Sequence, residues 1–137
     1  MTESIGRPKL ARIFAWLVPI LPLVLLLQAI MFSGYYEEFN RDFLDIHLYV
    51  ARVSNLFVIL LLILALIVRF PRSYRILPLI AAVTFLWIAQ DAMGESISDA
   101  RWLVWLHIPN AFILFGLSII LAARVHRLVF RKPSTTP

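Results

Sequence analysis

Four long apolar runs constrain this chain more than any other feature of its sequence. They cover residues 12–33, 47–69, 74–93 and 102–125 of a 137-residue chain that is 61% apolar and 15% charged. A helix needs about 20 mostly apolar residues to cross the roughly 30 Å of bilayer hydrocarbon, and an open sheet would leave unpaired amides in lipid. The sequence therefore predicts one all-α integral membrane domain over residues 1–137, a four-helix bundle in up-down-up-down order. We expect the polar tail, residues 132–137, to be disordered.

The charged residues are divided between the two ends of the predicted bundle. Ten of the 13 Lys and Arg residues lie in the N-terminal tail, in the connection between the second and third runs, and at the C-terminal end, whereas seven of the eight Asp and Glu residues lie in the other two connections. Basic connections face the cytoplasm. We therefore expect a multi-pass protein of the bacterial inner membrane, with the lipid bilayer as partner and both termini cytoplasmic. Three separate basic clusters argue against nucleic-acid binding.

Two features refine the spans. Trp87, Trp102 and Trp105 lie near the predicted outer boundary, where aromatic rings often form an interfacial belt. Pro19 and Pro22 fall inside the first run and predict a kink there, because proline lacks the amide hydrogen of the helical ladder.

An internal repeat is the feature most informative about function. Gln28 begins the segment Gln-Ala-Ile-Met and is followed 19 residues later by His47; Gln90 begins Gln-Asp-Ala-Met and is followed 17 residues later by His107. In the predicted topology all four residues lie near the outer face. A two-span repeat keeps its direction, so the copies are related by an axis along the membrane normal. The two histidine spans are then diagonal, about 12–14 Å apart if neighbouring axes are about 8–10 Å apart.

Small or polar residues share the histidine faces. Helical spacing places Ala51 on the face of His47, and Asn110 and Ala111 on the face of His107. These residues would open space beside each ring, although small residues in membrane helices also serve plain helix–helix packing.

The paired histidines suggest a metal site, with His47 and His107 as axial ligands of one haem b. A zinc or copper site would want three or four protein ligands, and the chain has no cysteine. Two pigments, each held by one histidine, are an alternative.

The remaining candidate cofactor-binding residues have more than one interpretation. Gln28 and Gln90 could bond the free ring nitrogens of the histidines or a cofactor substituent, or could form interhelical amide bonds. Arg52 is the one basic residue inside a span. It could pair with a haem propionate, pair with Asp91, or reach the outer interface.

The repeat resembles a bacterial family of small four-span membrane proteins of unknown function. The resemblance rests on Gln28 with His47 and on Gln90 with the segment Leu106-His107-Ile-Pro-Asn-Ala-Phe-Ile-Leu-Phe-Gly116. The first copy departs from the family at Ala51, where glycine is common. The resemblance implies fold and membrane location but no activity. A looser architectural likeness is to four-helix membrane b-type cytochromes, which hold haem between histidines of different spans.

These observations favour a membrane haem b electron-transfer protein over an enzyme, because no nucleophile–base pair, phosphate loop or carboxylate pair stands out in the sequence. The alternative is a non-catalytic accessory subunit of a larger respiratory or photosynthetic membrane complex that contacts pigment or quinone. The partners expected besides lipid are such a complex or further copies of this chain in a homo-oligomer. A small transporter is less well supported, since no acidic or lysine side chain lies deep in a span.

Overall fold

The predicted all-α class is confirmed. A computed structural model describes residues 5–38, 41–97 and 99–130, so the tail over residues 132–137 lies outside the described part. Within that part the chain forms helices and short connections. The helices are α1 (Pro8–Leu17), α2 (Ile20–Glu38), α3 (Arg41–Val68), α4 (Ile76–Glu95) and α5 (Val104–Phe130), with single 3₁₀ turns at Arg72–Tyr74 and Arg101–Leu103. Four candidate spans, Pro8–Gly34, Asp42–Val68, Ile76–Glu95 and Arg101–Phe130, are long and apolar enough to cross a membrane.

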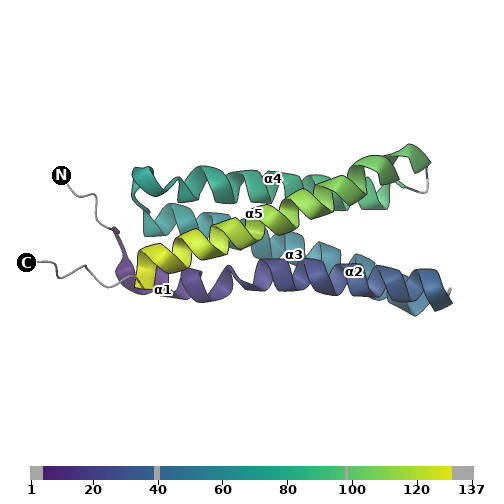
Figure 1. Cartoon of the computed structure of the whole chain (residues 1–137), viewed down its shortest axis with the longest axis horizontal. Coiled ribbons are helices and arrows are strands. Elements are labelled where there is room, and N and C mark those ends of the chain that lie inside the picture. The colour runs from purple at the N-terminus through teal and green to yellow at the C-terminus, as the bar shows by residue number, and fades with distance from the viewer. Residues whose placement is uncertain (1–4, 39–40, 98, 131–137) are drawn as a thin grey trace, which may run out of the picture.

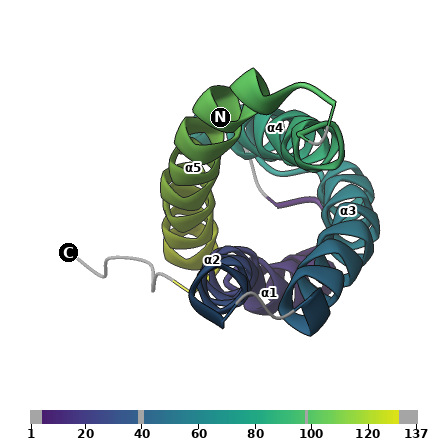
Figure 2. The same ribbon diagram turned by 90° about the vertical axis from the view of Figure 1, so that its right-hand side faces the viewer.

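The helices form a four-membered ring in which consecutive spans are neighbours. The α1–α2 rod packs on α3, α3 on α4 and α4 on α5, and α5 returns to the rod (Figure 2). The histidine-bearing helices α3 and α5 are therefore diagonal, as the repeat predicts. The start of α1 and the end of α5 lie at one end of the bundle (Figure 1), which we call the proximal end. The end of α2, the start of α3, the end of α4 and the start of α5 lie at the opposite end (Figure 1), which we call the distal end.

The first span is broken rather than smoothly kinked. Helix α1 stops at Leu17 and α2 starts at Ile20. Pro19 lies between them and has no amide hydrogen to continue the ladder, while Leu21 bonds to the Val18 carbonyl at 3.1 Å. The prolines thus interrupt the helical ladder and separate a proximal helix from a distal one, whereas the predicted kink in the helix axis stays a prediction.

The two ends of the bundle are packed differently. The proximal two thirds hold a continuous apolar core whose largest fully buried members are Phe14, Leu21, Leu61, Ile76, Ile80, Leu114 and Leu121. Distal to Leu21 on α2, Ser54 on α3, Trp87 on α4 and Asn110 on α5, none of the described residues is buried. The distal third is therefore the loosely packed part of the bundle.

One expectation about the aromatic belt is wrong. Trp102 and Trp105 are exposed, as interfacial residues should be, but Trp87 is 4% exposed and belongs to the core. Its indole closes the distal side of that core, which its position near a span end does not reveal.

The core predicts different effects for two adjacent apolar residues of α5. Leu121→Ala should lower the free energy of unfolding by about 2 kcal/mol or more, because a fully buried leucine leaves a cavity. Ile120→Ala is the matched control, since Ile120 is 43% exposed. Thermal unfolding in detergent measures both variants, and an equal loss in the two would contradict the assigned rotation of α5.

Candidate functional site

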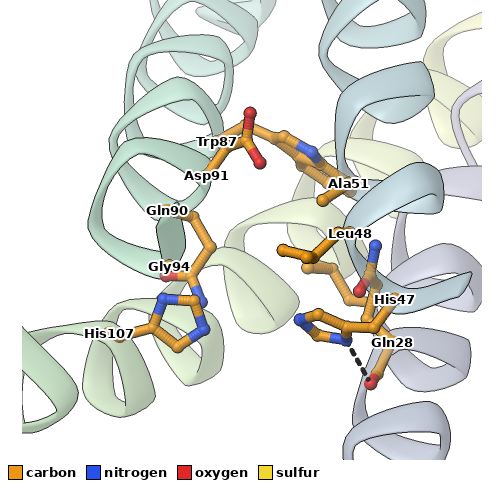
Figure 3. A pocket seen from close by; sticks show the side chains of 10 residues that line it. Gln28, His47, Leu48, Ala51, Trp87, Gln90, Asp91, Gly94 and His107 are labelled. Atoms are coloured by element: carbon orange, nitrogen blue, oxygen red, sulfur yellow. Dashed lines mark hydrogen bonds between the residues drawn. The ribbon is translucent and has the colours of Figure 1, made fainter. Parts of the chain in front are cut away.

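A small cavity lies in the distal third, between the two copies of the repeat (Figure 3). Its volume is about 50 Å³, enough for a few water molecules at roughly 10–15 Å³ each and far below the about 300–1,000 Å³ of typical ligand pockets. All four spans contribute to its wall, through Leu25, Gln28, His47, Leu48, Ala51, Trp87, Gln90, Asp91, Gly94 and His107. The structure thus brings together both glutamines and both histidines of the repeat.

The two imidazole rings occupy opposite walls of the cavity at a similar level (Figure 3). Nδ1 of His47 lies 3.0 Å from the backbone carbonyl oxygen of Gln28. A carbonyl can only accept, so Nδ1 must carry the proton and donate it. The lone pair of His47 is therefore on Nε2, the nitrogen through which this ring can bind a metal.

The second histidine is placed in a related way, without the same bond. The backbone of Gln90 interacts with the His107 ring, as the Gln28 carbonyl does with His47. However, Nδ1 of His107 is buried and has no partner that meets hydrogen-bond geometry among the described residues. A small rotation of the ring toward the Gln90 carbonyl would give both histidines the same tautomer.

Gly94 allows helix α4 to pass close to the His107 ring. A Cβ atom at this position would lie 3.1 Å from Cε1 of His107, closer than ordinary van der Waals contact. Gly94 is one helical turn beyond Gln90, so it lies on the face of α4 that meets α5. Sequence reasoning missed this residue, although the spacing from Gln90 was a signal that could have found it.

The glutamine side chains do not bond the histidines. Oε1 of Gln90 accepts a 2.7 Å bond from Nδ2 of Asn110, which also donates to the Leu86 carbonyl at 3.0 Å. Gln90 therefore follows the interhelical-amide interpretation. Oε1 of Gln28 is buried and lacks a partner within the described part of the chain. What the two glutamines share is the position of their backbone carbonyls relative to a histidine.

The charged residues near the cavity belong to two separate contacts between α3 and α4. Arg52 donates through Nε and Nη2 to Oε1 of Glu95, at 3.2 and 3.0 Å, and both side chains are largely exposed. Asp91 lines the cavity and accepts a bond from Nδ2 of Asn55. The partner of Arg52 is therefore Glu95, which sequence analysis did not consider. Arg52 itself does not line the cavity.

Of the remaining predicted cofactor-binding residues, one lines the cavity and two do not. Ala51 lines the cavity, whereas Ala111 is half-buried and does not. Asn110 is buried, and its side-chain amide donates hydrogen bonds to Leu86 and Gln90 of α4. The described residues contain no group of three or more His, Cys, Asp or Glu side chains able to hold a metal ion. The donors that line the cavity are the two imidazoles and the Asp91 carboxylate, which accepts a bond from Asn55.

Comparisons with protein-family models, with curated proteins and with solved structures found no match to this chain. No match therefore supports the resemblance to the four-span family or the likeness to membrane b-type cytochromes, and both stay predictions from the sequence.

The close contact at Gly94 gives a testable consequence. Gly94→Ala should push the His107 ring away from α4, because the added methyl would lie 3.1 Å from Cε1. The Cε1 and Cδ2 chemical shifts of ¹³C-labelled His107 measure this displacement. Gly116→Ala is the matched control, since a Cβ there meets no atom within 4 Å; similar shifts in both variants would count against the contact.

Proposed function

We propose that this protein is a membrane haem b protein that transfers electrons, with His47 and His107 as the two axial ligands. The observation that carries the proposal is that the two repeat histidines, from diagonal helices, line one cavity from opposite walls. Two imidazoles at one level on facing walls are the arrangement that an axial pair needs.

The chemistry of the donor set fits haem better than a free metal ion. A tetrahedral zinc site requires three or four protein ligands, whereas a porphyrin supplies four nitrogens and leaves two positions for the protein. The bond from Nδ1 of His47 to the Gln28 carbonyl orients the ring and leaves Nε2 facing the cavity (Figure 3). Supporting hydrogen bonds orient histidine ligands in the same way in metal sites.

Ligation by two histidines also favours one class of activity. Bound haem would supply one-electron chemistry, and two protein ligands leave no coordination position for a substrate. His47 and His107 would hold the group, Ala51 and Gly94 would keep neighbouring side chains off it, and Trp87 would separate it from the proximal core. The residues near the site thus bind, orient and exclude solvent rather than transfer protons to a substrate.

The size of the cavity sets a condition on this function. A volume of about 50 Å³ does not hold a macrocycle, so the walls must separate before haem binds. Helices in lipid are held together by side-chain packing and hydrogen bonds without a hydrophobic driving force, and no residue of the distal third whose burial is described is buried. Separation of the distal helices therefore breaks few packed contacts.

An absorption spectrum tests the proposal directly. The protein purified in detergent and supplemented with haemin should show a Soret band, with sharp α and β bands on reduction. His47→Ala and His107→Ala should each weaken haem binding by more than the roughly 10–100-fold that loss of a supporting residue costs a metal site. His126→Ala is the control, because this histidine lies at the proximal end of α5 against Phe130. Absence of a Soret band in the supplemented wild type would refute the proposal.

We further propose that the protein resides in the bacterial inner membrane with its proximal end in the cytoplasm. The support is the excess of Lys and Arg in the three proximal segments.

Single cysteines test this orientation, since the chain has none of its own. In spheroplasts, a membrane-impermeant maleimide should label Ser96→Cys at the distal end at once and should label Ser73→Cys at the proximal end only after permeabilisation. Both serines are exposed, so accessibility within the protein does not separate them. The reverse labelling pattern would invert the topology.

One observation favours a second candidate, an accessory subunit of a larger membrane complex. The Gln90 side chain is engaged by Asn110 and so serves helix packing, which a subunit without its own cofactor would also need. Co-purification with a larger complex at constant stoichiometry, without haem in this chain, would favour this candidate over the first.

A further inference from the structure

We infer that α2 is the movable wall of the cavity and that a flat ligand dissolved in the bilayer enters between α2 and α5. The identity of the ligand, a planar macrocycle, rests on the proposed function. The movement itself rests only on how the distal helices are joined.

The distal end consists of two helix pairs joined along one side. One pair is α2 with α3 and the other is α4 with α5, and each pair belongs to one copy of the repeat. Asn55 with Asp91 and Arg52 with Glu95 join α3 to α4. Among the side chains that the structure describes, which on α2 end at Gly34, no hydrogen bond joins α2 to α5. Helix α5 also leans across the bundle, so that its distal start lies beside α4 and its proximal end beside α1 (Figures 1 and 2).

Distal α2 is held by a narrow contact. Beyond Leu25 its described side chains are exposed except for Gln28, Met31 and Gly34, which are half-buried. These three residues are three apart and form one stripe along the helix. Gln28 accepts the bond from His47, and Gly34 lies close enough to Phe43 that a Cβ there would be 3.4 Å from its ring. Helix α2 packs more extensively on α3 than on α5, and the His47 bond and the Phe43 contact both belong to α3.

The two copies of the repeat differ at the residue that joins α5 to α4 by a side-chain hydrogen bond. Asn110 follows His107 by three residues and bonds Gln90 at 2.7 Å, tying α5 to α4. Val50 follows His47 by three residues, where the repeat would place the equivalent of Asn110. An apolar valine cannot bond the Gln28 amide, and Oε1 of Gln28 is buried without a partner among the described residues. The first copy therefore lacks the side-chain hydrogen bond that joins the two helices of the second copy. We call this bond in the second copy, between Asn110 and Gln90, the lock.

The break in the first span supplies the hinge. Helix α1 ends at Leu17 and α2 begins at Ile20, so the helical ladder is interrupted at Pro19. Phe14 before the break, Val18 within it and Leu21 just beyond it are completely buried in the core. The part of α2 that can move therefore begins after Leu21, at Pro22, which also lacks an amide hydrogen; hinges commonly lie near element ends.

Movement of α2 away from α5 would open the cavity toward the hydrocarbon. Leu26, Leu27 and Ile30 of α2 are apolar and exposed, so this part of the helix suits a ligand that arrives dissolved in lipid. Closure returns the Gln28 carbonyl to His47 and restores the orientation of that ring. The same bond therefore closes the site and positions one proposed ligand.

Distances between spin labels test the inference. Cysteines at Ile30 on α2 and Ile88 on α4 span the cavity, while cysteines at Ile88 and Ile108 report the locked α4–α5 pair; all three side chains are exposed and no native cysteine interferes. Pulsed electron–electron double resonance in lipid nanodiscs should give a broad or double distribution for the first pair and a narrow one for the second. Added haemin should change only the first distribution.

A lock introduced at Val50 makes the test specific. Val50→Asn offers Gln28 the partner that Asn110 gives Gln90, and should narrow the α2–α4 distribution and slow haemin uptake about threefold, the effect expected of one interhelical hydrogen bond in a membrane protein. Val50→Ala is the matched control and should leave the α2–α4 distance distribution as broad as in the wild type.

The possible outcomes separate this inference from the proposed function. A narrow α2–α4 distribution that haemin leaves unchanged, in protein whose Soret band shows bound haem, overturns the movable wall and leaves the haem function standing. A broad distribution in protein that binds no haem supports the movable wall and overturns the haem function. A narrow distribution without haem binding overturns both.

Discussion

Packing of the proximal core is the interaction on which the rest of the structure depends. Val58 and Leu61 on α3 and Leu114 and Leu121 on α5 are completely or almost completely buried. Because these residues are three apart on α3 and seven apart on α5, each pair lies on one face of its helix and sets the rotation of that helix about its axis. The stripe on α3 leads through Ser54 to His47, and the stripe on α5 leads through Asn110 to His107. The core therefore turns both histidines inward, although neither belongs to it.

The contrast between the two ends of the bundle links packing to function. A close-packed proximal end keeps the four helices in register. The distal third is held mainly by a few polar contacts, each of modest energy in a membrane protein. Sites that must admit a ligand are drawn from the less stable parts of a structure. This division is what the proposed movement of α2 requires: a rigid proximal frame and a cavity that would change size at the distal end.

The repeat acquires a different meaning in three dimensions. From sequence, the glutamines appear as side chains that could bond histidine or cofactor. In the structure their common contribution is a backbone carbonyl near an imidazole, with a direct bond in the first copy. Their side chains differ, because the second copy has Asn110 and the first has Val50 at the matching position. The two copies thus bring both rings to one cavity but differ in the hydrogen bonds that join each helix pair.

Sequence alone determined the class of fold, the number of spans, their order, the break near Pro19 and the presence of both histidines at one level. These follow from local quantities: hydrophobic length against bilayer thickness, the missing amide of proline, and helical periodicity. The tertiary structure alone decided that Gln90 bonds Asn110, that Arg52 pairs with Glu95, that Trp87 is buried, and that Gly94 touches the ring of His107. Each of these contacts depends on the rotation and tilt of one helix against another. Rotation and tilt arise from the packing of all four helices together, so they cannot be read from the sequence of any single span.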